Sequence, residues 1–252
     1  MKPIRTEQLG INFGGQPVLR NVSVSVDTGE FVALMGANGT GKTTLVRAML
    51  GLIRPDAGRA WLFDTPTDSF RDWQRVAYVP QHLIAANAVP LSVEEAVRSA
   101  LAGPRQRLRP LSRKQRTSIQ DALDRVGLGT RGRERLDHLS GGQQRRVMIA
   151  RALVTGADLL LMDEPTAGVD QGEQNRLADH IRDLHRDGAT IVLITHDLGP
   201  VASLATRAIV LGQPSADSVR YDGPTPPPAR WTEQFWHHSH DEESGPSLLE
   251  GP

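Results

Sequence analysis

Residues 36–43 have the types and spacing of a phosphate-binding loop. The segment GANGTGKT fits the pattern G-x-x-x-x-G-K-[ST], follows an apolar strand-like run and precedes a helical stretch. Glycines there let successive backbone N–H groups surround a phosphate, and the helix N-terminus adds the positive end of its dipole. We expect Lys42 to reach the β- and γ-phosphates and the Thr43 hydroxyl to ligate Mg²⁺. A glycine-rich turn that fits the pattern by chance is the alternative. The residues expected to contact nucleotide here are Gly36, Ala37, Asn38, Gly39, Thr40, Gly41, Lys42, Thr43 and Thr44.

A second candidate site is the apolar run 159–165, LLLMDEP, which ends in two carboxylates. Ligands of open α/β sheets bind at the carboxyl ends of the strands, so acids at that position indicate a site. Asp163 is placed to hold Mg²⁺ through water, and Glu164 to act as the general base toward the attacking water. The alternative is a solvated strand end.

A third pattern, LSGGQ at residues 139–143, opens a helical stretch. Ser140 is a good N-cap, and Gly141 and Gly142 leave backbone amides exposed, so this turn presents hydrogen-bond donors to an anion. By itself, SGG before a helix is weak support for a binding site.

Short β-branched runs alternate with helical stretches, which favours an α/β domain with a largely parallel sheet. The expected strands are Val22–Val26, Phe31–Met35, Val76–Val79, Leu159–Asp163 and Thr190–Thr195. The expected helices are Lys42–Leu50, Val93–Leu101, Arg113–Val126, Gly141–Val154 and Gly172–Arg186.

Changes in composition predict the boundaries. Strand-like sequence stops after Gln81 and helical, Arg-rich sequence takes over, so residues 82–140 are expected to form a helical subdomain inserted in the α/β core. The ATPase domain is expected to span residues 1–212. Residues 213–252 are expected to form a Pro-rich linker, stiffened by Pro224 and Pro226–Pro228, and a disordered His-containing tail.

Composition narrows the class of protein. The chain has 252 residues, 38% of them hydrophobic, with 29 basic and 29 acidic side chains. That balance lacks the basic excess of nucleic-acid binders, so no nucleic-acid partner is expected, and the basic residues Arg105–Arg116 are interpreted as a solvated face. The absence of cysteine excludes disulfides and thiolate metal sites. Neither a secretory signal nor a membrane-spanning run is recognised.

Taken in order, these motifs resemble those of ATP-binding cassette (ABC) proteins, whose signature is LSGGQ. Four further residues fall where that family has functional groups. Gln81 resembles the Q-loop glutamine that touches the metal, and Asp170 ends AGVD, which resembles the D-loop. His196 resembles the switch histidine at the γ-phosphate. Phe13 stands where the family places an aromatic residue on adenine, although tyrosine is commoner there.

The resemblance implies a P-loop NTPase (RecA-like) core with an antiparallel N-terminal part. It implies that two copies close head to tail around two ATP molecules with Mg²⁺, each site joining one copy's phosphate loop to Ser140 and Gly142 of the other. Gly141, Gln143 and Asp170 are also expected to contact nucleotide. Lys42, Gln81, Glu164 and His196 would be catalytic, and Thr43, Gln81 and Asp163 would hold Mg²⁺. The partners implied are membrane permease subunits at the cytoplasmic side of the cell membrane and, through them, an extracytoplasmic substrate-binding protein.

Soluble family members usually carry two cassettes or a long coiled coil, which this chain lacks, so a transporter subunit is favoured over a protein acting on nucleic acid or ribosomes. The sequence YVPQ at 78–81, PLSV at 90–93 and Val169 before Asp170 resemble the zinc and manganese uptake branch. The tail residues His237, His238 and His240 are candidate Zn²⁺ ligands. A siderophore or other-substrate transporter is the alternative.

Overall fold

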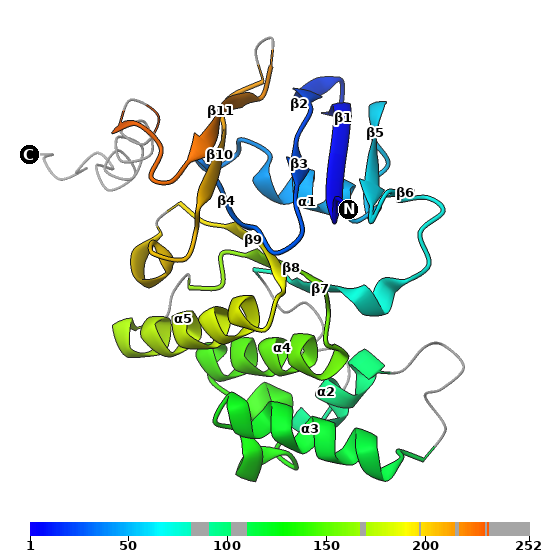
Figure 1. The fold of residues 1–252 in the computed structure, drawn as a ribbon, viewed down its shortest axis with the longest axis vertical. Helices are drawn as coiled ribbons and strands as arrows, with labels where there is room; N and C mark the ends of the chain where they lie inside the picture. The colour runs from blue at the N-terminus through cyan, green and yellow to red at the C-terminus, as the bar shows by residue number, and fades with distance from the viewer. Residues whose placement is uncertain are drawn as a thin grey trace, which may run out of the picture.

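The computed structural model describes residues 1–81, 91–101, 110–166, 170–196, 198–214, 217–229 and 231. They form two β-sheets with helices packed between and below them (Figure 1). The first sheet is antiparallel, and the second is mixed and carries the phosphate-loop segment.

The N-terminal sheet has the strand order β2-β1-β5-β6, with β3 also paired to β1. Its strands are β1 (Ile4–Phe13), β2 (Gln16–Val22), β3 (Ser25–Val26), β5 (Ala57–Leu62) and β6 (Thr65–Pro66). Along β1 the apolar Ile4, Leu9 and Ile11 are buried while the polar Gln8 and Asn12 are exposed, as expected of a sheet with one face on the core. The antiparallel N-terminal part implied by the family resemblance is therefore confirmed.

The expected single strand Val22–Val26 is wrong, because the chain leaves the ladder between β2 and β3. The buried Thr6 hydroxyl donates to the Val22 carbonyl at 3.0 Å and accepts from the Val24 N–H at 3.1 Å. The Gln8 N–H likewise donates to the Ser23 hydroxyl at 2.8 Å. Between β2 and β3, side chains thus replace some backbone hydrogen-bond partners. The β-branched residues of this segment do not predict that break.

The second sheet has the order β11-β10-β4-β9-β8-β7, parallel throughout except that β11 runs antiparallel to β10. Its strands are β4 (Phe31–Gly36), β7 (Val76–Val79), β8 (Leu159–Asp163), β9 (Thr190–Ile194), β10 (Arg207–Leu211) and β11 (Val219–Pro224). Alternate residues of β4 enter two separate cores, with Phe31 in one and Val32 in the other. A sheet buried on both faces explains the nearly continuous apolar runs.

The helices occupy both faces of this sheet. They are α1 (Lys42–Met49), α2 (Val93–Leu101), α3 (Arg113–Arg125), α4 (Gly141–Thr155) and α5 (Gln171–Arg186). Leu45 and Val46 of α1 pack in the core shared by the two sheets, whereas α2–α5 build the core on the opposite face (Figure 1). Each predicted helix is confirmed to within one residue at either end. Short 3₁₀ turns lie at η1 (Trp73–Arg75), η2 (Gly129–Arg131), η3 (Leu136–His138) and η4 (Gly199–Val201).

Two observations bear on the expected boundaries. Between β7 and β8 the described residues form α2, α3, η2, η3 and α4, where the sequence predicts an inserted helical segment. At the other boundary, the sheet continues past residue 212, since β11 pairs with β10 over Arg207↔Pro224 to Leu211↔Val219. The polar side chains and Pro224 of β11 resemble linker sequence, which is why the sequence places the domain end too early.

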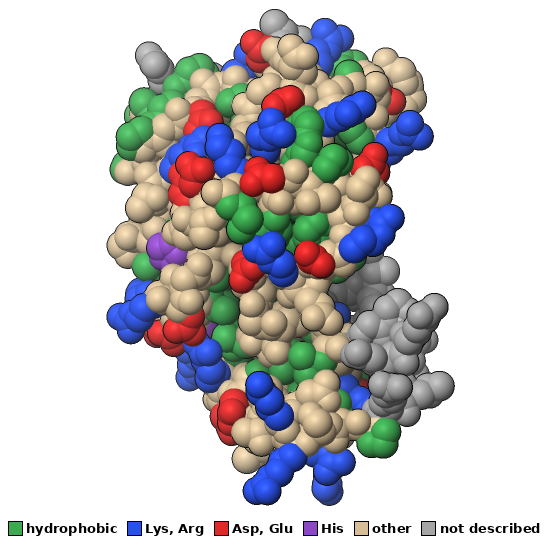
Figure 2. All heavy atoms as spheres, turned by 45° about the vertical axis from the view of Figure 1, so that its right-hand side comes forward, with side chains coloured by type: hydrophobic (Ala, Val, Ile, Leu, Met, Phe, Trp, Pro, Cys, Tyr) green, Lys and Arg blue, Asp and Glu red, His purple; other side chains and the backbone are tan. Residues whose placement is uncertain are grey.

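Charges of both signs are mixed on one face of the molecule. On the face shown in Figure 2, Lys and Arg side chains are interspersed with Asp and Glu over most of the area. This fits the equal numbers of basic and acidic residues in the chain.

Arg207 ties three parts of the structure together at the start of β10. Its guanidinium donates to both Asp222 oxygens, at 2.5 and 2.7 Å, to Glu30 at 3.2 Å and to the Ser25 carbonyl at 3.0 Å. Bidentate, partly buried pairs of this kind hold both position and orientation. The C-terminal strand is thereby linked to the chain that enters β4.

We expect Arg207→Met, which keeps the apolar stem, to lower the free energy of unfolding by about 2 kcal/mol because two partly buried carboxylates lose their donor. Arg125→Met is the matched control, since its pair with Asp187 is exposed at both ends, and it is expected to cost less than about 0.5 kcal/mol. Urea unfolding of both variants measures the difference. Equal losses would contradict the assigned role of Arg207.

Candidate nucleotide-binding site

The phosphate loop connects β4 to α1 and packs closely against the end of β10. Gly36 has a φ of 151°, and a Cβ at this position would lie 2.6 Å from the Leu211 carbonyl oxygen and 2.7 Å from the Thr40 hydroxyl. Gly41, at the N-cap of α1, has a φ of 89°, and a Cβ there would lie 2.8 Å from Leu19. Both positions therefore need glycine, as the motif predicts.

Lys42 turns back into the loop that it follows. Its ammonium donates to the carbonyl oxygens of Gly36 at 2.8 Å and Ala37 at 3.0 Å, and the residue is only 6% exposed. Burial lowers the pKa of the ammonium, while the carboxylates of Glu164 and Asp163 oppose that shift. A phosphate oxygen would be a charged acceptor in place of two carbonyls, so the loop is built to exchange these bonds for an anion.

Asp163, at the carboxyl end of β8, contacts the first turn of α1. Its Oδ2 accepts from the Thr43 hydroxyl at 2.8 Å, and the residue is 2% exposed. Burial raises the pKa of this carboxyl, the hydrogen bond from Thr43 opposes the rise, and the neighbouring Glu164 adds to it. Hydroxyl and carboxylate oxygens are the ligands that Mg²⁺ prefers, so these two side chains fit a metal that accompanies a phosphate.

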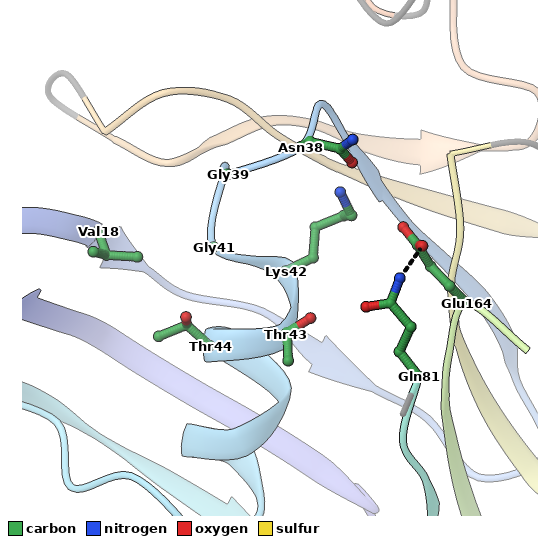
Figure 3. A pocket seen from close by; sticks show the side chains of 9 residues that line it. All are labelled: Val18, Asn38, Gly39, Gly41, Lys42, Thr43, Thr44, Gln81 and Glu164. Carbon is green, nitrogen blue, oxygen red and sulfur yellow. Dashed lines mark hydrogen bonds between the residues drawn. The ribbon is translucent and has the colours of Figure 1, made fainter. Parts of the chain in front are cut away.

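Glu164 is held in a backbone conformation that non-glycine residues seldom adopt, with a φ of 45°. Its N–H donates to the Ile194 carbonyl at 3.0 Å, which fixes the turn after β8 against the end of β9. Gln81 donates through Nε2 to Glu164 Oε2 at 2.7 Å (Figure 3), and His196 Nδ1 lies 3.7 Å from Oε1. Local strain of this kind concentrates at functional sites, and here it aims a carboxylate into the pocket.

The pocket has a volume of about 360 Å³ and opens over the loop and the acid pair. It is lined by Val18, Asn38, Gly39, Gly41, Lys42, Thr43, Thr44, Gln81 and Glu164 (Figure 3). Eight of these nine residues are predicted from the sequence. Val18 is not, because a single apolar residue on a strand carries no signal of a binding site.

Two other residues predicted to bind nucleotide, Thr40 and Phe13, do not line the pocket. Thr40 is buried and donates to the Ala37 carbonyl at 2.9 Å, which supports the loop. Phe13 ends β1 and is 53% exposed, available to a planar ligand. Asp56 supports the β1–β2 hairpin, because its carboxylate accepts from the Asn12 backbone N–H at 2.6 Å and from the Asn12 side-chain amide at 3.1 Å. The sequence analysis did not predict this contact.

The LSGGQ segment stands apart from the pocket of its own chain. Ser140 caps α4 and forms a reciprocal capping box with Gln143, at 3.3 and 3.0 Å, as the predicted N-cap requires. A Cβ on Gly141 would meet no atom within 4 Å, so this turn is open. Asp170 precedes α5, and its carbonyl accepts from the Gln174 N–H. None of these residues lines the described pocket. Residues 167–169 and the tail histidines His237, His238 and His240 lie outside the described residues.

Comparisons with known proteins agree with this architecture. A family model described as "ABC transporter" matches residues 19–167. The zinc transport system ATP-binding protein AdcC of Streptococcus pneumoniae is 37% identical over 213 residues, covering 84% of this chain and 90% of the relative. The zinc import ATP-binding protein ZnuC of Pseudomonas fluorescens is 36% identical over 250 residues, covering 94% and 87%. A nucleotide-free ATP-binding cassette from an ABC transporter superposes with a TM-score of 0.78 at 23% identity, over 97% of this chain and all of that one, which supports the fold.

The buried Asp163 carboxyl is expected to cost stability in the absence of ligand. Because its pKa is raised in the folded state, folded protein binds more protons than the unfolded chain above pH 3.8, and stability falls as pH rises toward the folded-state pKa. Asp163→Asn cannot ionise, so we expect it to be about 1 kcal/mol more stable than the parent at pH 8, with a smaller difference near pH 4.

Urea unfolding at both pH values measures this effect. Asp121→Asn, on the exposed side of α3, serves as the control and should show no such gain. An Asp163→Asn protein less stable than the parent at pH 8 would contradict the argument.

Proposed function

The chain belongs to the ABC transporter family as an ATPase whose ATP hydrolysis drives transport, and we propose that the transported cargo is a divalent metal ion, zinc or manganese. The observation that carries the choice of cargo is similarity along most of the chain, at 36–37% identity, to relatives named for zinc transport. The YVPQ and PLSV segments add to that support.

The proposed reaction places the phosphates of ATP in the loop 36–43. Lys42 would leave the Gly36 and Ala37 carbonyls for the β- and γ-phosphate oxygens, and the loop amides would bind the same groups. Thr43, Asp163 and Gln81 would hold Mg²⁺, which neutralises charge on the phosphates when bound. The meeting of the Thr43 and Asp163 side chains at 2.8 Å supports this role.

Glu164 is the proposed general base. Its carboxylate would accept a proton from the attacking water, and His196 would contact the γ-phosphate on the exposed side. In the present geometry the Gln81 amide occupies one carboxylate oxygen of Glu164. An ionised carboxylate accepts several hydrogen bonds, so the attacking water could bind beside the Gln81 amide, which would orient the base.

A second copy of the chain is proposed to complete each site. Ser140 and Gly142 do not line their own pocket, and an open, capped helix start is suited to donate amides to another copy's γ-phosphate. Preorganised donors aimed at developing charge supply a large part of catalysis in such sites.

The cassette is part of a transporter complex with a membrane permease. Within the described ranges, no helix has both the length and the apolarity needed to cross a membrane. We place the chain at the cytoplasmic side of the cell membrane, bound to permease subunits that receive cargo from an extracytoplasmic binding protein. A siderophore or other substrate remains the second candidate cargo.

Glu164→Gln is expected to bind ATP, to lower the turnover rate by about 10²- to 10⁴-fold and to accumulate as an ATP-bound dimer. The amide keeps the shape of the side chain but cannot take a proton. Phosphate release and the mass of the complex in solution measure both effects, with Glu94→Gln on the exposed face of α2 as the control. Normal turnover would rule out Glu164 as the base.

Deletion of the chain is expected to reduce cellular zinc or manganese selectively when cells grow in metal-limited medium. Elemental analysis of deleted cells, parent cells and cells complemented with the Glu164→Gln form measures this. Failure of that form to restore the metal would connect uptake to hydrolysis. Unchanged metal content would exclude this cargo while leaving the ATPase assignment intact.

A further inference from the structure

The hydroxyl of Tyr78 is a buried polar group close to the acid pair. Tyr78 lies on β7, with its ring against the core that the two sheets share. Its hydroxyl oxygen is buried and makes no hydrogen bond of normal geometry to the described residues. Phenylalanine would fill the same space without burying a polar atom, so packing alone does not account for this hydroxyl.

Strand register places this hydroxyl on the side of Asp163. Tyr78 of β7 pairs with Leu161 of β8, and Asp163 lies two residues further along β8, so the three side chains share one face of the sheet. The same face receives α1, whose Thr43 donates to Asp163. Arg47 lies one turn after Thr43 on α1.

Asp163 and Arg47 both act on this hydroxyl. Burial raises the pKa of the Tyr78 hydroxyl, and the Asp163 carboxylate raises it further, while Arg47 opposes the shift. A phenol hydroxyl is ordinarily protonated at neutral pH and is therefore available as a donor. Thr43 uses Oδ2 of Asp163, and an ionised carboxylate can accept several more hydrogen bonds.

We propose that Tyr78 is a positioning residue for the nucleotide-bound metal, whose hydroxyl donates to the Asp163 carboxylate when Mg²⁺ is bound. The inference rests on the MgATP site of the proposed function and adds a residue to it. Asp163 must be ionised and correctly oriented to receive the metal, and a second donor besides Thr43 would serve both requirements. Such outer partners of metal-binding groups commonly change metal affinity by 10- to 100-fold.

The test compares the Mg²⁺ dependence of nucleotide binding in the full-length parent, Tyr78→Phe and Tyr221→Phe. Tyr221 is the other tyrosine of the chain, and its hydroxyl donates to the Pro224 carbonyl at 2.7 Å, away from the pocket. The probe is a fluorescent ADP, titrated with and without Mg²⁺. We expect Tyr78→Phe to raise the half-saturating Mg²⁺ concentration about tenfold while its affinity in EDTA stays that of the parent. Tyr221→Phe should match the parent throughout.

Each other result has a definite meaning. An unchanged Mg²⁺ requirement, or an equal loss of affinity with and without Mg²⁺, would overturn the positioning role. A large loss of stability of ligand-free Tyr78→Phe in urea would also overturn it, in favour of a structural role. In an Asp163→Asn background, Tyr78→Phe should have no further effect, because the hydroxyl acts through that carboxylate. Nucleotide binding by the parent that ignores Mg²⁺ altogether would instead contradict the metal site of the proposed function.

Discussion

Burial of the parallel sheet on both faces is the constraint on which the rest of this structure depends. Strands β4, β8 and β9 alternate between two apolar cores, so none of their middle residues can carry a functional polar group. Polar chemistry is confined to the edge where the strands end. The phosphate loop follows β4, the acid pair stands at the end of β8 and His196 follows β9, and parallel pairing brings these three ends together. The site is a consequence of the register.

Within the pocket, the groups proposed to bind ligand bind one another. Lys42 donates to loop carbonyls, Thr43 to Asp163 and Gln81 to Glu164. These bonds satisfy groups that would be costly to bury alone, yet each group would have a stronger partner in the proposed metal–phosphate ligand. Binding would therefore be an exchange of hydrogen bonds, and the strained turn at Glu164 would keep its carboxylate at the pocket during that exchange.

The structural features that the sequence predicts are those formed by contiguous residues. The phosphate loop, the apolar strand with its acids and the capped helix at Ser140 each lie within eight residues or fewer, and their local geometry follows from residue type. The antiparallel sheet was predicted only from the family resemblance. Its strands have one solvated face and therefore lack the nearly continuous apolar runs of the second sheet. Val18, Tyr78 and the Arg207 network could not be predicted, since their roles depend on strand pairing or on residues that are distant in sequence. The break at Ser23 was missed because the Thr6 side chain, on β1, takes the place of backbone partners there.

The position of β4 in the sheet has a consequence for the synthesis of the protein. Phe31 pairs with Ile191, and Val32 with Arg207, so the strand that leads into the phosphate loop is enclosed by two strands made about 160 to 175 residues later. The Leu211 carbonyl that fits against Gly36 belongs to the later of them. Pairing over such distances forms slowly and late. A growing chain on the ribosome thus carries the loop sequence long before it has the loop structure, and nucleotide-binding competence arrives only after the residues through Leu211 have been made.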